Sequence, residues 1–299
     1  MMVETDYLVN SLGPLGVFYK LFSSRVPFYL NIHLIIMINR ILNYMHSPKI
    51  NWFKTLFINF YKLDFKIAIK LPIYIYEGVH FKDLSGEIRV YNAVRGGIRI
   101  GLRNDAPSIH GVPTYINLIG TIQFNRYCQI GEGNFINVYN PKAVLYIHEN
   151  VRINNCNIIA CGTTISLGEQ VLIASNVQIH STESHYLIHG EKIHTGYGDE
   201  VIIGRNTWIG NNCTILKNTY LGDDCIVAAN TVCTVSTPSG DGCLLAGNPA
   251  KVISRNEVRL LRNLDDEGYV WDAFNKGVAN VYIGELPKSA TGLLYQTAY

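Results

Sequence analysis

The chain has 299 residues, of which 48% are hydrophobic, and a formal net charge of +2 at pH 7. A chain of this length can bury a large core, either as one long domain or as a domain with appendages. The charge is nearly neutral, and no stretch combines dense Lys and Arg with aromatic residues, so nucleic acid is excluded as an expected partner.

Residues 1–84 are predicted to form a mainly helical segment. The apolar stretch 26–45 contains several polar residues and Arg40, whereas a spanning helix needs about 20 predominantly apolar residues. Residues 51–70 mix aromatic residues with four lysines, a combination that suits a helix lying on a membrane surface. The alternative is a helical subdomain packed against the body of the protein. The first six residues carry two acids and no Lys or Arg, unlike a secretion signal.

From about residue 77 the chain changes to short β-branched runs separated by glycines, which predict strands and turns. Within the β-rich domain, expected over residues 85–254, apolar residues recur every six positions. They are Ile147, Ile153, Ile159, Ile165, Val171 and Val177, and later Ile203, Ile209, Ile215, Leu221, Val227 and Cys233. Small residues follow at a second phase, at Thr207, Cys213, Thr219, Cys225 and Thr231. A fixed short period of this kind is typical of a parallel β-helix.

Cysteine usage indicates a reducing compartment. The seven cysteines are an odd number, and no two form a CxxC pair. Several stand at positions of the six-residue repeat, here called the lattice, where a small apolar group fits. Buried free thiols are therefore favoured over disulfides or zinc. We therefore expect a cytoplasmic protein, with the N-terminal segment as a candidate for contact with the inner face of the membrane.

The lattice is interrupted once. Counting by sixes from Ile179 reaches Ile203 with the phase kept, but the positions between are not apolar core residues. Residues 181–200 are therefore predicted to leave the coil as a loop rich in ionisable groups. Polar loops held by a rigid scaffold often carry function.

The stretch 143–254 resembles the hexapeptide-repeat superfamily of left-handed parallel β-helix acyltransferases, most of all the bacterial O-acetyltransferases of capsule and O-antigen clusters. Three motifs carry the resemblance: IGRNTWIG at 203–210, VAANTV at 227–232 and GNPAKVI at 247–253. It implies an all-β core formed by a left-handed parallel β-helix, with an N-terminal helical segment and a C-terminal extension over 255–299. It also implies a homotrimer whose sites lie between neighbours.

The activity implied by the resemblance is acetyl transfer from acetyl-CoA to a sugar hydroxyl of a surface polysaccharide or its precursor. The superfamily's histidine motif falls on residues 181–185 (STESH), which makes His185 the matching base. A neutral imidazole can take the proton of a sugar hydroxyl and return it to the leaving thiolate. Glu183 matches the carboxylate that orients the ring, although it is one methylene longer than the usual aspartate.

The resemblance also implies binding residues. Trp208 and Asn211 match positions that contact the acceptor or the donor. Ala228 and Ala229 form a strip of small side chains along which a pantetheine arm can lie, with Thr234 beside it. The remaining candidates are Lys251 and Arg255, cations near the last coil where the anionic nucleotide of coenzyme A would lie. Lys217 is a further candidate cation, but it could equally be a solvated corner residue. Neither an acyl-enzyme nor a metal is expected.

Several alternatives stay open. N-acetylation of an amino-sugar nucleotide would use the same base and donor. A β-helix can also serve as a non-catalytic binding module. Gamma-class carbonic anhydrases are left-handed β-helices that hold zinc with histidines, two of them five apart, as are His180 and His185. The residue two coils before His180 is Val144, however, so the third ligand is missing from that pattern. The sequence does not select the acceptor sugar, because such pockets share no common code.

Overall fold

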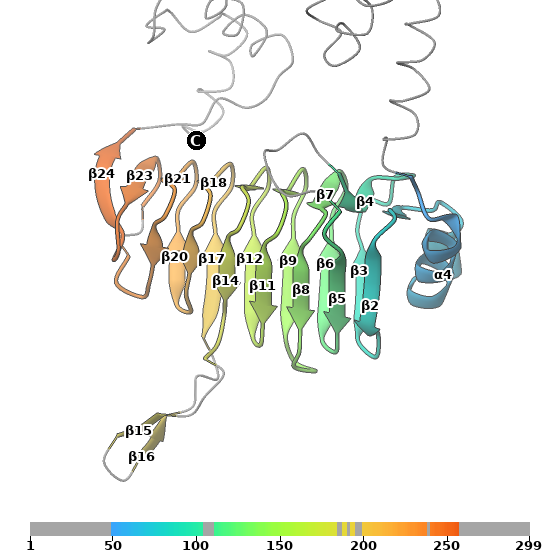
Figure 1. The fold of residues 1–299 in the computed structure, drawn as a ribbon, viewed down its shortest axis with the longest axis horizontal. Coiled ribbons are helices and arrows are strands. Elements are labelled where there is room, and N and C mark those ends of the chain that lie inside the picture. Colours follow the sequence, from blue (N-terminus) through green and yellow to red (C-terminus); the bar gives the residue numbers. More distant parts are fainter. Residues whose placement is uncertain are drawn as a thin grey trace, which may run out of the picture. The chain divides into compact units, whose positions relative to one another are not determined.

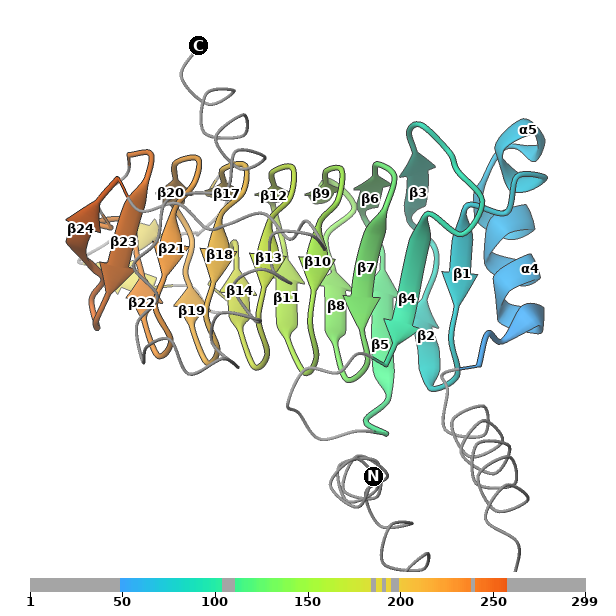
Figure 2. The same ribbon diagram turned by 90° about the horizontal axis from the view of Figure 1, so that it is seen from above.

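The computed structural model describes residues 49–103, 111–183, 199–237 and 240–256, and the backbone alone of 187–189 and 192–194. Within these residues the chain winds into three sheets that enclose one apolar core, and their strands pair in parallel except for the last strand, which is antiparallel (Figures 1 and 2). The fold is the left-handed parallel β-helix that we predicted. Residues 1–48 and the tail from 257 lie outside the described residues.

Each turn of the coil contributes strands to three sheets, here named in chain order. The first sheet contains β1 (Ile73–Ile75), β4 (Ile98–Leu102), β7 (Cys128–Gly131), β10 (Arg152–Ile153), β13 (Leu172–Ile173), β18 (Trp208–Ile209), β21 (Ile226–Val227), β23 (Cys243–Ala246) and β24 (Lys251–Arg255). The second contains β2 (Val79–Asp83), β5 (Thr114–Leu118), β8 (Phe135–Val138), β11 (Ile158–Cys161), β14 (Gln178–His180), β19 (Thr214–Ile215) and β22 (Val232–Cys233). The third contains β3 (Glu87–Val90), β6 (Thr121–Phe124), β9 (Val144–Ile147), β12 (Thr164–Leu167), β17 (Glu200–Ile203) and β20 (Thr219–Leu221).

The six-residue lattice is the inward-facing side of these sheets. Its residues from Ile203 to Cys233 are each at most 3% exposed, and the small residues of the second phase are equally buried. The register places Trp208 beside Ile226, which is three hexads later. Each coil therefore stacks its apolar side chains on those of the next. All seven cysteines are free and six are buried, which confirms the expected thiols.

Three lines of corners join the sheets. The first corner joins the first and second sheets, as at residues 210–213 and 228–231; the second joins the second and third sheets, as at 216–218; the third joins the third and first, as at 204–207 and 222–225. A left-handed residue turns the chain at each of these corners: Asn206, Asn212, Asn218, Asp224 and Asn230, with φ between 55° and 60°. Asn and Asp tolerate this conformation better than other side chains.

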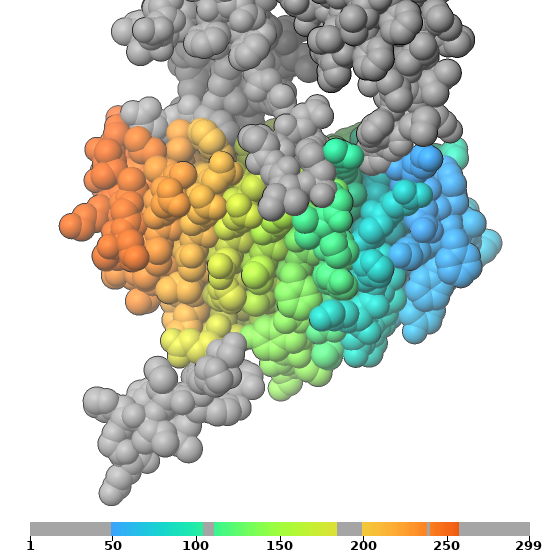
Figure 3. Space-filling view, viewed as in Figure 1, coloured from blue at the N-terminus to red at the C-terminus, as the bar shows by residue number. Residues whose placement is uncertain are grey.

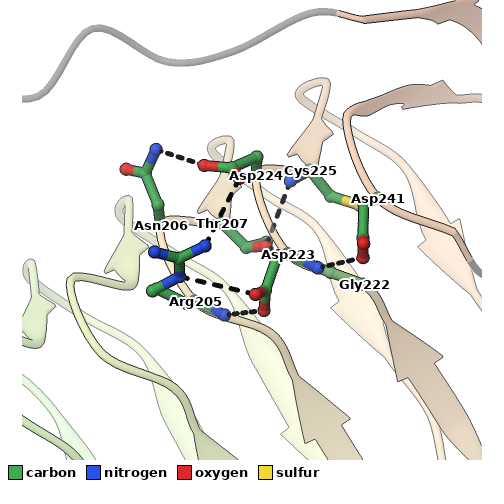
Figure 4. A network of polar contacts seen from close by, with 8 residues as sticks. All are labelled: Arg205, Asn206, Thr207, Gly222, Asp223, Asp224, Cys225 and Asp241. Atoms are coloured by element: carbon green, nitrogen blue, oxygen red, sulfur yellow. Dashed lines mark hydrogen bonds and ion pairs between the residues drawn. The ribbon is translucent and has the colours of Figure 1, made fainter. Parts of the chain in front are cut away.

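The third corner is held by a ladder of side-chain caps (Figure 4). Asp223 Oδ1 accepts a hydrogen bond from the Arg205 backbone amide at 2.7 Å, and Asp241 Oδ1 accepts one from the Asp223 amide at 2.8 Å. Asp224 Oδ1 accepts from the Asn206 side chain at 2.7 Å. Successive coils are thus tied together by carboxylates that satisfy backbone donors. We interpret this corner as structural.

At the N-terminal end the prediction that the β-helix begins at residue 85 is wrong. Strands β1 and β2 precede that residue and pair with β4 and β5. Ile73 pairs with Ile98, 25 residues later, so the first coil does not keep the six-residue spacing and could not be found by its period. Before it stand the helices α4 (Trp52–Lys62) and α5 (Phe65–Ala68). In the described part of the chain, no helix is both long and apolar enough to cross a bilayer.

Candidate active site

The predicted loop leaves the coil at the second corner, between β14 and β17 (Figure 1). Its described backbone includes two short antiparallel strands, β15 (Leu187–His189) and β16 (Lys192–His194), with Leu187 opposite His194. His185, the predicted base, lies outside the described residues, so its role stays a prediction. The described ends of the loop show how the coil holds it.

Both ends of the loop are attached to the coil that precedes it. The Ser181 side chain is fully buried, and its Oγ accepts hydrogen bonds from the amides of Gly162 at 3.1 Å and Thr163 at 3.2 Å. Thr163 Oγ1 in turn contacts the carbonyl oxygens of Ser181 and Asp199. Thr163 therefore links the first and the last residues of the loop.

Lys217 links the same two ends from the coil that follows. Its Nζ lies 2.9 Å from Asp199 Oδ2 and 3.5 Å from Glu183 Oε1. Asn218 Nδ2 donates to the other Asp199 oxygen at 2.8 Å. These contacts place Lys217 among carboxylates of the loop base. Its predicted role as a ligand of the donor's phosphates stays untested, and its described contacts favour holding the loop instead.

The ionisation of this cluster is fixed by the same contacts. The hydrogen bond to Asp199 raises the pKa of Lys217, and the charges of Asp199 and Glu183 add to the effect. Burial alone would raise the pKa of Asp199, but the hydrogen bonds from Lys217 and Asn218 outweigh it and lower that pKa. Lys217 is therefore a cation and Asp199 an anion at neutral pH. Glu183 has an ion-pair partner, and its side chain is 45% exposed.

A different set of predicted residues gathers at the first corner. Asn211 Oδ1 accepts a hydrogen bond from the Ser175 amide at 3.0 Å, which ties two coils together. Ala228 and Ala229 lie one coil later, and Ala229 is exposed. A Cβ added at Gly210 would come within 2.8 Å of the Ala229 nitrogen. The coils therefore stack closely at this corner, and the small side chains of Ala228 and Ala229 form a strip on it that fits an extended amide-bearing arm.

Trp208 lies next to this strip on the outer side of the first sheet, where it is 40% exposed. It stands between Leu172 and Ile226 in the register of neighbouring strands. An exposed indole over a strip of apolar neighbours provides a flat surface for a sugar or thioester. The role of Trp208 in binding stays a prediction.

The cations predicted to bind phosphate are not brought together. Lys251 and Arg255 stand at opposite ends of β24, opposite Ala246 and Cys243. Lys251 is near the first corner, because the amide of the preceding Ala250 donates to Val232 O. Arg255 is at the third corner, with Nη1 3.4 Å from Cys243 Sγ. Of the two, only Lys251 shares a corner with the alanine strip.

Thr234 lies just after β22, where the chain passes the second corner. Its amide donates to Thr237 Oγ1 at 2.6 Å, and its hydroxyl lies 2.9 Å from Ser236 Oγ. Apart from Arg255, the described candidate residues of one chain therefore form two groups, at the opposite ends of the strands of the second sheet. Thr234 is five positions after Ala229, which corresponds to at most about 16 Å of chain. A single copy does not bring the loop base to the alanine strip.

The sequence motifs do not identify Ser181, Thr163 and Asp199 as anchors of the loop. The interruption of the lattice was an available signal, since residues at both of its ends must attach to the coil. For the zinc alternative, the described residues contain no group of three or more His, Cys, Asp or Glu side chains that could hold a metal ion. His180 is half-buried, with Nε2 3.3 Å from Gln178 Oε1, and burial lowers its pKa.

Comparisons with known proteins agree with the sequence motifs. Residues 200–234 match the family described as bacterial transferase hexapeptide (six repeats). WbbJ of Escherichia coli (strain K12), provisionally named a lipopolysaccharide biosynthesis O-acetyl transferase, is 30% identical over 152 residues, which cover 48% of this chain and 76% of WbbJ.

Solved structures with similar coils are more distant. The polySia-specific acetyltransferase NeuO is 16% identical, with 69% of this chain and 84% of NeuO covered and a TM-score of 0.40. The polysialic acid O-acetyltransferase OatWY is 20% identical, with 66% and 98% covered and a TM-score of 0.33. A mutant of the N-acyltransferase AntD from Bacillus cereus, solved with dTDP and coenzyme A, is 14% identical, with 68% and 88% covered and a TM-score of 0.38.

Proposed function

The chain belongs to the bacterial hexapeptide-repeat transferases and is an acyltransferase, and from this premise we propose that it transfers an acetyl group from acetyl-CoA to a sugar hydroxyl. The acceptor we propose is a surface polysaccharide or its precursor. The observation that carries the proposal is the 30% identity with WbbJ over 152 residues, which cover 76% of that protein. The relatives NeuO and OatWY are also named for polysaccharide acetylation.

In the proposed reaction His185 acts as general base. Its neutral imidazole accepts the proton of the sugar hydroxyl while the hydroxyl oxygen attacks the thioester carbonyl carbon. The carbon–sulfur bond then breaks, and the imidazolium returns the proton to the leaving thiolate. The polar anchors of the loop support this role, because a base must be held within hydrogen-bond reach of its substrate. Glu183 is proposed to orient the ring, with its own carboxylate held by Lys217 at 3.5 Å.

The donor is proposed to lie along the first corner. Ala228 and Ala229 leave room for the pantetheine arm, and Trp208 and Asn211 stand where the thioester and acceptor would meet. Lys251 lies at the same corner and could neutralise phosphate charge. Thr234 and Arg255 are kept as candidate donor contacts from a neighbouring copy or the last coil. The proposed chemistry needs no metal.

We propose a homotrimer with three equivalent sites. The two groups of candidate residues lie at opposite ends of the strands of the second sheet. Within one chain, the loop and the alanine strip are therefore apart. Packing three copies side by side brings the second corner of one copy to the first corner of the next. Such an arrangement would complete each site from two subunits. We also propose a cytoplasmic location, with the N-terminal segment in contact with the inner face of the membrane.

The test is release of free thiol from acetyl-CoA with a panel of sugars, amino-sugar nucleotides and purified polysaccharides. We expect release with at least one hydroxyl acceptor, and a loss of about 10²–10⁴-fold for His185→Ala. His80→Ala is the matched control, since His80 is exposed on β2 and stacks on Tyr115, away from the loop. If none of the acceptors gives thiol release, acetyl transfer is refuted. If only amino sugars give release, N-acetylation is favoured. A fully active monomer in light scattering would refute the shared site.

A further inference from the structure

Helix α4 turns its polar side toward the protein. Its buried residues are Thr55, Ile58 and Asn59, and the two polar ones are 0% exposed. In an ordinary surface helix of a soluble protein the apolar stripe faces the core and the polar face meets water. In α4 this arrangement is reversed.

The buried polar residues have a structural reason to be there. They cover the outer edge of β1, the first strand of the first sheet, beside which the described residues contain no further strand of that sheet. Asn59 Nδ2 donates to Ile73 O at 2.7 Å, and Asn59 Oδ1 accepts from Ile73 N at 3.3 Å. Thr55 Oγ1 accepts from Ile75 N at 3.0 Å. Two side chains thus replace a neighbouring strand.

The opposite side of α4 is apolar and uncovered among the described residues. We call it the aromatic face. Its members recur with helical spacing and continue into α5: Trp52, Phe53, Leu56, Phe57, Phe60, Tyr61, Phe65 and Ile69. The most exposed are Phe53 at 81% and Phe65 at 72%. In the space-filling view α4 forms one end of the body (Figure 3). Exposed apolar surface of this extent marks an interaction site.

The charges around the aromatic face are almost all positive. Residues 49–70 contain five lysines and one acid, Asp64. Lys54 and Lys62 turn back to cap backbone carbonyls, Lys62 donating to Gly86 O at 2.8 Å. Lys49, Lys66 and Lys70 are exposed. Exposed lysines flanking aromatic and aliphatic side chains match an anionic, partly apolar surface.

We propose that the aromatic face docks on a membrane surface that contains anionic lipids. This inference deepens the membrane contact proposed above and does not depend on acetyl transfer. An anionic lipid surface is favoured over a second protein copy because lysines that repel each other would face one another in a symmetric pair. The face would insert its aromatic side chains at the level of the headgroups, with Lys49, Lys66 and Lys70 on the lipid phosphates.

The proposal also orients the β-helix. Because α4 covers the end of the coil, docking places the axis of the coil away from the membrane. Four coil steps separate β2 from β14 in the second sheet, and with the thickness of the helix this puts the loop base about 30 Å from the surface. An acceptor attached to a membrane lipid by a few sugars would lie within this range.

The experiment is flotation of the full-length protein with vesicles. The wild type should float with phosphatidylglycerol-containing vesicles and much less with pure phosphatidylcholine. We expect the double variant Phe53→Ser/Phe65→Ser to lose most of this binding, and Lys66→Gln/Lys70→Gln to lose its dependence on anionic lipid. The control is Ile253→Ser, which removes another exposed apolar side chain, 63% exposed, at the other end of the coil.

Each result bears on the proposal separately from the enzyme assay. If the wild type binds no vesicle, or if the Phe53→Ser/Phe65→Ser variant floats like the wild type, the aromatic face is not a lipid contact. In the second case residues 1–48 would be the place to look for the contact. A change in oligomeric state of this variant, without a change in flotation, would assign the face to another copy. Thiol release with a soluble acceptor should be unchanged in these variants.

Discussion

Replacing Lys217 by methionine separates two roles for this side chain. Lys217 Nζ is 2.9 Å from Asp199, and the two side chains are 28% and 20% exposed. A hydrogen bond between charged groups contributes about 1.5–3 kcal/mol, and the contact with the half-exposed Glu183 about 0–1 kcal/mol. Since Asn218 still satisfies Asp199, we take about 2 kcal/mol, which is a factor of about 30 in the balance between held and released loop ends.

The measurement is steady-state kinetics of thiol release at varied acetyl-CoA. If Lys217 positions the loop, kcat falls about tenfold and at most about 30-fold, while KM for acetyl-CoA changes little. Lys217→Arg should restore most of the rate, and Lys142→Gln, at an exposed lysine, is the control. A raised KM for acetyl-CoA with kcat kept would refute positioning and support the phosphate role.

The pH dependence of this cluster follows from the two shifts. The lowered pKa of Asp199 means that its contribution is complete above the ordinary pKa of 3.8 and is lost as pH falls through the lowered value. The raised pKa of Lys217 means that its contribution is complete below 10.5 and is lost as pH rises through the raised value. Between about pH 5 and 9 the cluster is therefore constant, and kcat should follow one group, assigned to His185. A second ionisation in this range that disappears in Lys217→Met would contradict the assignment.

Three further predictions concern stability and reactivity. Burial raises the pKa of Cys161 to about 12, so at pH 8 only about one Cys161 thiol in 10⁴ is ionised. Cys161 of the native protein should therefore resist iodoacetamide, and the free energy of unfolding should fall as pH rises above 9.0, where the thiol of the unfolded chain ionises. Rapid labelling of native Cys161, located by mass spectrometry, would contradict the burial. Asn59→Ala should lower the free energy of unfolding by about 2–4 kcal/mol, measured by urea denaturation, because β1 loses its edge partners. The control Phe53→Ala should change the free energy of unfolding by less than about 0.5 kcal/mol. Equal effects of the two substitutions would argue against the role of Asn59 in capping the edge of β1. Gly204→Ala places a Cβ 2.4 Å from backbone atoms of Gly222, so it should disrupt the stacking of coils and lower the melting temperature. In the control Gly240→Ala the new Cβ meets nothing closer than 3.6 Å, and the melting temperature should be nearly unchanged. Similar melting temperatures for the two variants would show that the coils can separate.

The location of the loop was predictable from the sequence, but its attachment was not. The failure of the lattice between Ile179 and Ile203 marks the exit from the coil, because the phase of inward-facing residues is fixed by the chain itself. Which side chains hold the two ends depends on which coils are neighbours. Lys217 lies 34 residues after Glu183 in the chain, and only the stacking of coils makes them partners. The position of Lys217 in the six-residue repeat made it a candidate for phosphate binding or for a solvated corner, and neither interpretation includes this contact.

Helix α4 shows the limit of periodicity in another way. Its aromatic spacing predicts an amphipathic helix, but the rule for soluble helices would place that stripe on the core. The direction was decided by the open edge of β1, which offers backbone groups and accepts Asn59 and Thr55 in place of apolar side chains. The need of an unpaired strand for hydrogen-bond partners is a tertiary condition that no local pattern records.

The sequence alone determined the coil, its buried residues and its thiols, because a six-residue period assigns an inward position to each hexad without reference to distant contacts. Even the corners were encoded, since Asn and Asp recur every six residues from Asn206 to Asn230. Only the tertiary structure decided that the coil begins at Ile73, that Lys251 and Arg255 lie at opposite ends of a strand, and that the candidate site is divided between two corners. These properties depend on which residues become neighbours when the irregular coils and the ends of the strands pack. The six-residue repeat carries no information about those contacts.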